Sequence, residues 1–148
     1  MIRLEGQVAI VTGGARGIGA GICELFCKAG ATVALWDVLD SGAETAARIA
    51  QSGASIFYQK VDITSKSEVE AAVAQLIEKH QKIDILINNA GVIRDRSFLK
   101  MEQSDWDTVM NVNLNALFIT CKAVVPHMKA AGYGRIVSAS SINGFQGA

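Results

Sequence analysis

The chain has 148 residues, half of them hydrophobic, which is enough to bury the core of one domain spanning residues 1–148. Its 14 Lys and Arg residues balance 14 Asp and Glu residues, so no basic field is expected to attract nucleic acid or an anionic membrane surface. No apolar run reaches the length of a membrane span, the N-terminus lacks the core of a signal peptide, and three cysteines suggest neither a disulfide framework nor a metal site. These features predict a cytoplasmic protein without a nucleic-acid or membrane partner.

The first predicted unit is a buried strand, a glycine-rich turn and a helix. Residues 7–12 are apolar and β-branched without alternation, which is typical of a strand covered on both faces. Glycines follow closely, and apolar residues then recur at helical spacing until a stop at residues 29–30: Ile18, Ile22, Leu25 and Phe26. The positive end of such a helix dipole and its free N–H groups would face a ligand over the turn, and a phosphate fits best.

The glycine spacing distinguishes between kinds of phosphate-binding turn. Gly13, Gly17 and Gly19 give G-x-x-x-G-x-G, and Ala20 stands where a P-loop needs lysine, which disfavours a nucleoside triphosphatase. A glycine cluster alone is as consistent with a structural turn. Asp37 adds weight to the functional interpretation, because it follows a second apolar run roughly 20 residues on, where a ribose-binding acid belongs.

Short strands and amphipathic helices alternate along the rest of the chain. We expect strands at 55–61, 83–88 and 135–139, and helices at 41–52, from a Ser65 or Ser67 cap to about His80, and from a Ser104 cap to about residue 131. Pro126 should kink or interrupt the last helix. This alternation predicts an α/β fold, a doubly wound Rossmann-type parallel sheet with helices on both faces and a ligand at the carboxyl ends of the strands.

Polar residues gather where the predicted strands end. They are Asp37, Asp62, Asn88, Asn89, Ser138, Ser140 and Ser141. Any of them is equally consistent with a turn residue that satisfies nearby backbone groups, and for Asn88 we prefer that structural role. On the long helix, Asn111 is likewise expected to bond neighbouring backbone.

With these motifs the chain resembles the short-chain dehydrogenase/reductase family over its whole length. Residues 12–19 match the family motif T-G-x-x-x-G-[IL]-G, and Asn88-Asn89-Ala90-Gly91 follows in the right order. The resemblance implies a nicotinamide cofactor, with the adenine held by Asp62 and Ile63 and the adenosine ribose beside Asn89, Ala90 and Gly91. The remaining expected cofactor-binding residues are Gly13, Arg16, Gly17, Ile18, Gly19 and Asp37. The Asp37 carboxylate favours NAD over NADP, although Arg16 could attract a phosphate.

The resemblance also implies catalytic roles for two residues. Asn113 matches the asparagine that helps to hold a proton relay, and Ser141 matches the serine that hydrogen-bonds the reacting oxygen, with Ser140 as the adjacent alternative. The general acid/base motif Y-x-x-x-K is not reached before Ala148, and Tyr58 and Tyr133 do not fit it. The chain therefore resembles the cofactor-binding half of such an enzyme, with a sheet that is incomplete at its C-terminal end.

These observations predict an NAD-dependent oxidoreductase that interconverts a small-molecule alcohol and a ketone by hydride transfer. Enzymes similar to 3-oxoacyl reductases and to hydroxysteroid or sugar alcohol dehydrogenases are the candidates, and the full-length protein is expected to form a homo-oligomer. The 148-residue chain alone is expected to be inactive. The alternative is a non-catalytic NAD-binding module or an inactive fragment of such an enzyme.

Overall fold

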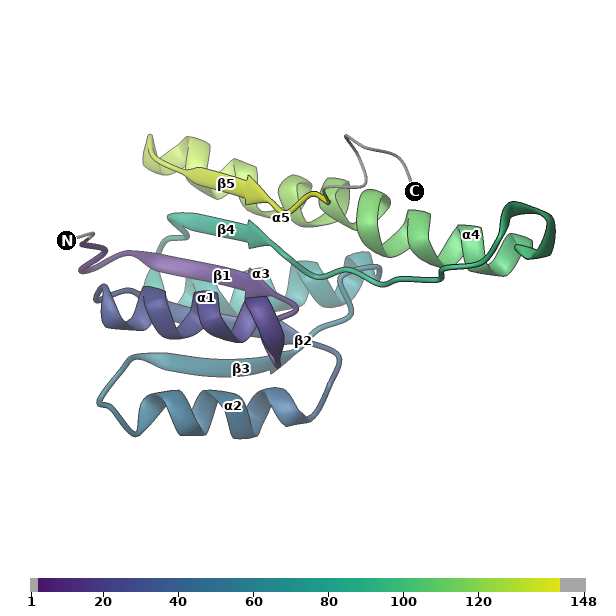
Figure 1. The fold of residues 1–148 in the computed structure, drawn as a ribbon. Helices are drawn as coiled ribbons and strands as arrows, with labels where there is room; N and C mark the ends of the chain where they lie inside the picture. The colour runs from purple at the N-terminus through teal and green to yellow at the C-terminus, as the bar shows by residue number, and fades with distance from the viewer. Residues whose placement is uncertain (1–2, 142–148) are drawn as a thin grey trace.

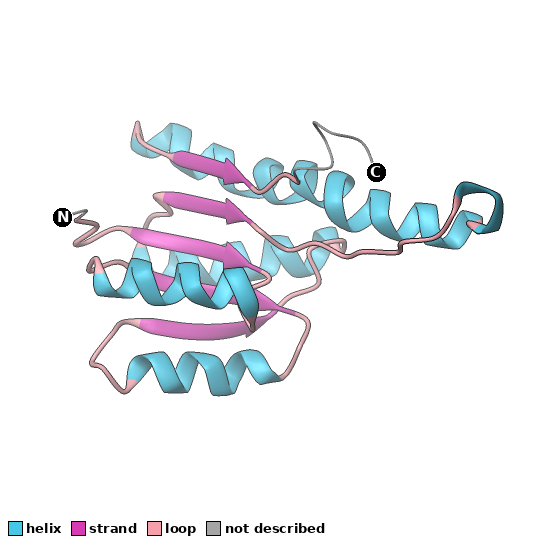
Figure 2. Ribbon diagram, in the orientation of Figure 1, coloured by secondary structure: helices cyan, strands magenta, loops and turns pink. Residues whose placement is uncertain are grey.

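A computed structural model describes residues 3–141, and its centre is a five-stranded parallel sheet (Figures 1 and 2). The strands are β1 (Val8–Thr12), β2 (Thr32–Asp37), β3 (Ile56–Lys60), β4 (Ile85–Asn88) and β5 (Arg135–Ser138). Their order in the sheet is β3-β2-β1-β4-β5, and all neighbouring pairs are parallel. The direction of strand addition reverses between β1 and β4. The predicted α/β fold is therefore confirmed, and the reversal marks the edge where ligands of such sheets bind.

Helices cover both faces of this sheet (Figure 1). The helices are α1 (Gly17–Lys28), α2 (Ser41–Ala50), α3 (Lys66–His80), α4 (Gln103–Met110) and α5 (Ala116–Ala131), with a 3₁₀ turn η1 (Phe98–Lys100) and a π-helical turn η2 (Asn111–Asn115). Of these, α4 projects beyond the ends of the strands (Figure 1). Helices α1 and α2 pack in one apolar cluster with Val11, Val33 and Leu35. Helices α3 and α5 pack in the other, with Ile10 and Trp36. Because successive strand residues point to opposite faces, each central strand contributes to both clusters.

Helix α1 packs on the sheet through small side chains. We expected its apolar residues to form the buried face, but Ile18 is 78% exposed and Leu25 is 64% exposed. The buried residues are Gly19, Cys23 and Cys27. A methyl group at Gly19 would overlap the carbonyl oxygen of Gly13, so this side of the helix lies against the turn without room for a branched side chain. Ile22 and Phe26 are partly buried and pack against the same cluster, so the apolar spacing identifies part of the buried face and the close approach of α1 to the turn decides the rest.

The long helical region differs from the expectation in two ways. It begins at Gln103 with Glu102 as the cap, because Glu102 and Asp105 form a reciprocal capping box, so the predicted cap at Ser104 is wrong. Pro126 does not interrupt the helix, since α5 runs through it to Ala131. Pro126 is exposed, so water can solvate the carbonyl that loses its helical donor. The irregularity instead lies at η2, one turn before α5.

The continuous helical stretch Gln103–Ala131 also corrects the expectation about membrane-spanning length. With 29 residues and a mean hydropathy of 1.3, it is long and apolar enough to cross a membrane by length and composition, and it is the one such helix among the described residues. The sequence contains no unbroken apolar run of this length, because polar residues interrupt the apolar residues of this helix. Its mean hydropathy is nevertheless high enough to meet the criterion. One helix of this kind is weak support for a membrane span, because core helices meet the same criteria.

Strand β5 forms one edge of the sheet within the described residues. All four of its residues are exposed, including the apolar Ile136 and Val137 at 40% and 55%. Its partner on the inner side is β4, with Leu86 opposite Ile136. Within the described residues the sheet thus ends on an exposed, partly apolar edge strand.

Candidate cofactor site

A cavity of about 580 Å³ lies at the carboxyl ends of the strands. It is lined by every residue that the sequence marked for cofactor binding: Gly13, Arg16, Gly17, Ile18, Gly19, Asp37, Asp62, Ile63, Asn89, Ala90 and Gly91. The structure adds apolar lining from Val38, Leu39, Val92 and Val112, among others. The size falls within the range of small-molecule and cofactor sites. The cavity opens beside the N-terminus of α1, at the reversal of strand order.

The turn from β1 to α1 needs glycine for different reasons at different positions. Gly13 has φ of +66°, and an added Cβ would lie 2.8 Å from Cα of Ala90. Gly17 has φ of +56°, but nothing lies within 4 Å of its added Cβ. Gly13 therefore permits a close backbone contact inside the protein, whereas Gly17 supplies the left-handed conformation beside open space. This division leaves the side of the turn at Gly17 accessible to a ligand.

The start of α1 retains unpaired backbone donors. Its N-cap residue, Arg16, has an extended backbone, and the Arg16 side chain makes no capping hydrogen bond. The helical hydrogen bonds begin at the Ala20 N–H, which donates to the Arg16 carbonyl. The N–H groups of the first helical turn have no partner within the helix. Together with the helix dipole they favour an anion at this end of the cavity.

Thr12 holds the ends of β1 and β4 together. It is fully buried, and its Oγ1 accepts hydrogen bonds from the backbone N–H groups of Asn89 and Ala90, both at 3.0 Å. The Asn89 amide donates in return to the carbonyls of Thr12 and Gly13, at 3.1 and 3.3 Å. The sequence analysis quoted Thr12 only as part of a motif and gave it no role. A hydroxyl at the end of an otherwise apolar buried strand was the available signal.

Asp37 is held in place by backbone donors at the end of β2. Its Oδ2 accepts from the Ala15 N–H and its Oδ1 accepts from the Leu39 N–H, each at 3.0 Å. A carboxylate has about four acceptor positions, so two remain for hydroxyl donors. Nearby, Tyr58 donates its hydroxyl to the Asp37 carbonyl at 3.3 Å. Burial first, and then the carboxylate of Asp40, raise the pKa of Tyr58, which keeps this hydroxyl protonated as a donor.

Asp62 and Ile63 lie just after β3, the strand next to β2, and also line the cavity. Oδ1 of Asp62 accepts from both the N–H and the hydroxyl of Thr64, at 2.9 and 2.7 Å. The same turn leads to Ser65, whose hydroxyl accepts from the Glu68 N–H and caps α3, as predicted. Ile63 adds an apolar surface to the lining. A flat aromatic base would find both a hydrogen-bond acceptor and an apolar contact here.

Asn113 joins the π-helical turn to the segment after β4. Its amide donates to the Val92 carbonyl at 2.9 Å, and its Oδ1 accepts from the Val92 N–H at 2.8 Å. The neighbouring Asn111 bonds the side chain of Asn115 at 2.9 Å, so its expected bond to backbone is not what the structure shows. π-turns are rare and often accompany functional positions. The Asn113 pairing therefore fixes an unusual turn at the mouth of the cavity.

Asn88 braces the sheet, in agreement with the structural role preferred for it. It is buried, accepts from the Thr120 hydroxyl of α5 at 2.8 Å, and donates to the Ser138 hydroxyl of β5 at 3.4 Å. Ser140 and Ser141 follow β5 and are exposed, and neither lines the cavity. The structure thus gathers the eleven residues predicted to bind a cofactor around one cavity, with Asn113 beside Gly91 and Val92, but does not bring Ser141 to that cavity.

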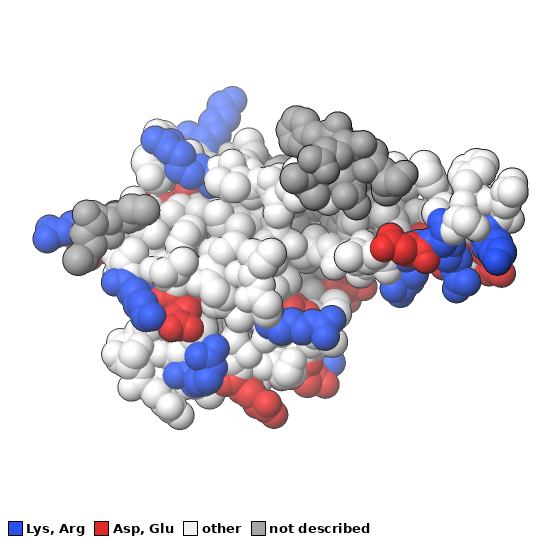
Figure 3. Space-filling model, in the orientation of Figure 1, with Lys and Arg blue, Asp and Glu red and all other residues white. Residues whose placement is uncertain are grey.

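Charges show no dominance of one sign on the face drawn in Figure 3, where basic and acidic side chains are interspersed. Among the described residues no group of three or more His, Cys, Asp or Glu side chains could hold a metal ion. Cys23 and Cys27 are buried thiols, and burial raises their pKa to about 12 and about 11. These two thiols stay protonated within the packing of α1 against the sheet.

An open parallel sheet with a glycine turn, a helix N-terminus and an acid after β2 defines a dinucleotide-binding α/β protein. The chain belongs to the short chain dehydrogenase family, whose profile matches residues 7–148. It is 39% identical to the 3-oxoacyl-(acyl-carrier-protein) reductase FabG of Chlamydia pneumoniae, over 95% of this chain and 57% of that protein. It is 35% identical to the reductase of the same name from Thermotoga maritima, over 99% of this chain and 60% of that protein.

Other relatives carry different names. The chain is 40% identical to the acetoacetyl-CoA reductase of Allochromatium vinosum, over 95% of this chain and 58% of that protein. It is 38% identical to the oxidoreductase UcpA of Salmonella typhimurium, over 97% of this chain and 55% of that protein. The chain thus spans less than two thirds of the length of these relatives. These relatives and this chain share the short chain dehydrogenase family.

Proposed function

We propose that these residues form the cofactor-binding part of an NAD-dependent oxidoreductase that interconverts an alcohol and a ketone. The observation that carries the proposal is the meeting of the α1 N-terminus, Asp37 and Asp62 around one cavity at the reversal of strand order. The donor set suits a dinucleotide, because it offers N–H groups for phosphates, carboxylate oxygens for hydroxyls and an apolar wall for a base. A nicotinamide cofactor, when bound, would supply or accept the hydride.

The chain's own residues would bind and orient that cofactor. The first turn of α1 and Gly17 would face the phosphates, Asp37 would accept from the ribose hydroxyls, and Asp62 with Ile63 would contact the base. Asn89, Ala90 and Gly91 would lie beside the adenosine ribose, since the hydrogen bonds of Thr12 hold this segment beside the turn. Most of these groups are already fixed by hydrogen bonds within the protein, which lowers the entropic cost of binding.

The preference for NAD rests on the position of the Asp37 carboxylate. A 2′-phosphate at ~4 Å from this charge would be repelled by roughly 4 kcal/mol at an effective dielectric constant near 20, before salt screening reduces the energy. Arg16 is exposed, and an exposed ion pair typically contributes only about 0 to 1 kcal/mol. The repulsion therefore outweighs the attraction.

The proposed substrates are small ketones and alcohols, including β-keto thioesters of the kind named in two of the relatives. In the full-length enzyme Ser141 would hydrogen-bond the reacting oxygen and Asn113 would support the proton relay. We also propose a homo-oligomer in the cytoplasm, with no nucleic-acid or membrane partner, and the three cysteines free in the structure suit a reducing compartment.

The test compares cofactor binding with turnover. Calorimetric titration of the full-length protein should show tighter binding of NAD than of NADP. The Asp37→Asn variant should reduce the difference between the two dissociation constants. The full-length protein should oxidise NADH with acetoacetyl thioesters, whereas residues 1–148 alone should show no turnover, because they contain no Tyr-x-x-x-Lys acid/base pair. Tighter binding of NADP would contradict the assignment of Asp37.

The alternative is a non-catalytic NAD-binding module. Binding without turnover by the full-length protein across a panel of ketones would support that alternative. Turnover that requires Ser141 would exclude it.

A further inference from the structure

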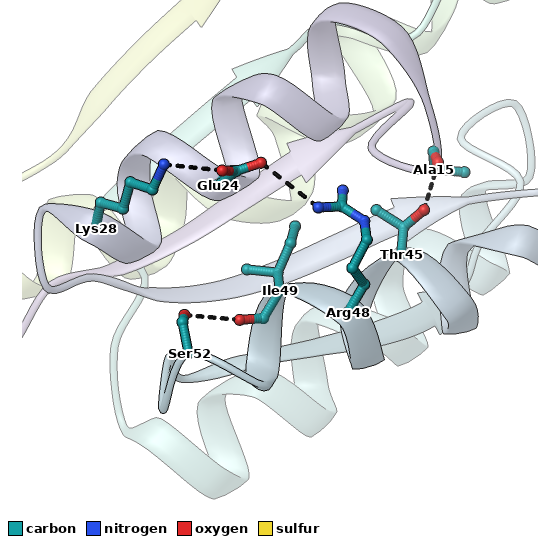
Figure 4. A network of polar contacts seen from close by, with 7 residues as sticks. All are labelled: Ala15, Glu24, Lys28, Thr45, Arg48, Ile49 and Ser52. Atoms are coloured by element: carbon teal, nitrogen blue, oxygen red, sulfur yellow. Dashed lines mark hydrogen bonds and ion pairs between the residues drawn. The ribbon is translucent and has the colours of Figure 1, made fainter.

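Ala15, in the turn before α1, is held from two directions. Its N–H donates to Oδ2 of Asp37 at 3.0 Å, and its carbonyl oxygen accepts from Oγ1 of Thr45 at 2.7 Å. Thr45 lies on α2 and points toward this carbonyl (Figure 4). Thr45 belongs to none of the glycine or acid motifs and does not line the cavity. It acts on the site only through the backbone of Ala15.

The two bonds fix the orientation of consecutive peptide groups. A peptide group is planar and trans, so the Ala15 carbonyl and the Arg16 N–H point in opposite directions from one plane. The Thr45 hydroxyl therefore sets the direction of the Arg16 N–H at the cap of α1. The Asp37 bond sets the preceding peptide in the same way, and the Gly14 N–H is held by the Trp36 carbonyl at 3.2 Å. The turn cannot rotate at Ala15 without losing one of these bonds.

We propose that Thr45 is a positioning residue that makes the site select NAD over NADP, an inference that rests on the proposed dinucleotide site. With the Thr45 bond in place, the peptide on each side of Ala15 is held, so the Ala15 N–H stays on Asp37 and keeps the carboxylate where a 2′-phosphate would meet it. Without that bond the peptide between Ala15 and Arg16 turns and the Ala15 backbone relaxes with it. Asp37 then loses one of its two backbone donors, and the exposed Arg16 moves with the turn. Loss of the Thr45 hydroxyl therefore weakens NAD binding and relieves the repulsion of NADP.

Contacts other than the Thr45 hydrogen bond also hold α2 against the rest of the protein. Arg48 forms an ion pair with Glu24 of α1 at 3.6 Å, and Glu24 also pairs with Lys28 at 2.8 Å (Figure 4). Ala46 and Ile49 anchor α2 in the apolar cluster. Arg48 provides a matched control, because it links the same two helices from the surface without touching Ala15 or the cavity.

The experiment measures dissociation constants of NAD and NADP by calorimetry, and urea unfolding midpoints, for the full-length protein and its variants. Thr45→Val should weaken NAD binding roughly threefold to tenfold, the range expected for one hydrogen bond, while NADP binding changes less than about twofold. Thr45→Ser keeps the hydroxyl and should keep the wild-type ratio of the two constants. Arg48→Gln should also keep that ratio even if it lowers the unfolding midpoint.

Two results would overturn the inference while leaving the proposed function intact. One is an unchanged NAD-to-NADP ratio in Thr45→Val, and the other is an equal weakening of both cofactors, which indicates only general loosening of the turn. If Thr45→Val does not fold, Thr45→Ala is measured instead, because it removes the hydroxyl without placing a methyl group beside the carbonyl. The ratio of its NAD and NADP dissociation constants then tests the inference in the same way. A wild-type protein that binds neither cofactor would instead refute the proposed function itself.

Discussion

Gly19 and Gly21 offer a matched test of how α1 is placed against the turn. Both lie in the same helix, but an added Cβ at Gly21 meets nothing within 4 Å. At Gly19 the Cβ would overlap the carbonyl oxygen of Gly13 and lie 2.7 Å from Nδ2 of Asn89 and 2.8 Å from the Gly13 carbonyl carbon. The neighbours at Gly19 are mainly backbone atoms that cannot rotate away. Alanine is therefore expected to act in opposite directions at these two positions.

The magnitudes follow from two opposing effects. Alanine in a helix gains about 0.5 to 1 kcal/mol over glycine, so Gly21→Ala should raise the free energy of unfolding by that amount. Gly19→Ala has the same gain, but overpacking typically costs about 1 to 3 kcal/mol. The net effect at Gly19 is a loss of up to roughly 2.5 kcal/mol, because the overpacking cost exceeds the helix gain.

Urea unfolding and calorimetric titration of NAD, both on the full-length protein, test the pair. Displacement of α1 from Gly13 moves its N–H groups away from the turn, so Gly19→Ala should weaken NAD binding more than tenfold, as expected when several fixed contacts shift together. Gly21→Ala should leave the dissociation constant within about twofold. Equal stability and equal NAD affinity in the two variants would refute the close approach of α1 to the turn.

The remaining predictions concern Thr12, the serines after β5, and His80. Thr12→Val should lower the unfolding free energy by about 1 to 3 kcal/mol and weaken NAD binding, because the N–H groups of Asn89 and Ala90 lose their acceptor. Unchanged urea unfolding curves would contradict the role given to these two hydrogen bonds. In the full-length enzyme Ser141→Ala should lower kcat about 100-fold with little change in NAD affinity, and Ser140→Ala should do much less; the reverse order would shift the assignment by one residue. Burial first, and then the charge of Lys79, lower the pKa of His80, so its stabilising effect is complete above its ordinary pKa of about 6.5 and is lost as the pH falls below it. Unfolding free energies at pH 7.5 and 5.5 should therefore differ more in the wild type than in His80→Gln, and equal differences would count against this role.

The parallel sheet and the grouping of the predicted site residues could be predicted, because alternating strands and helices favour parallel strands whose carboxyl ends meet at one edge. Asp37, Asp62 and Asn89 each follow an apolar strand, and strands that run in parallel bring such positions to one edge. No contact information was needed for that step. The capping of α3 by Ser65 was equally local, since it depends on a bond to Glu68 three residues away.

The buried face of α1 could be predicted only in part from apolar spacing, because the distance between helix and turn also decides it. Ile22 and Phe26 pack against the core, whereas Ile18 and Leu25 are exposed and Gly19 lies against Gly13 without room for a Cβ. The π-turn at Asn111–Asn115 was also beyond the local pattern. It depends on Asn113 pairing with Val92, which lies 21 residues earlier in the chain.

Hydrogen bonds within the protein show what the sequence motifs alone did not convey about the site. The sequence assigned ligand contacts to Asp37 and Asn89, yet in the structure their side chains first hold backbone groups of the protein, at Ala15, Leu39, Thr12 and Gly13. A turn residue and a ligand contact are therefore not alternatives at these positions. Each side chain places one peptide group of the cavity wall, and its remaining acceptors or its backbone face the cavity. Cofactor affinity should accordingly depend as much on the bonds that precede binding as on those that binding forms, which is why Thr12 and Thr45 are the sharpest places to test it.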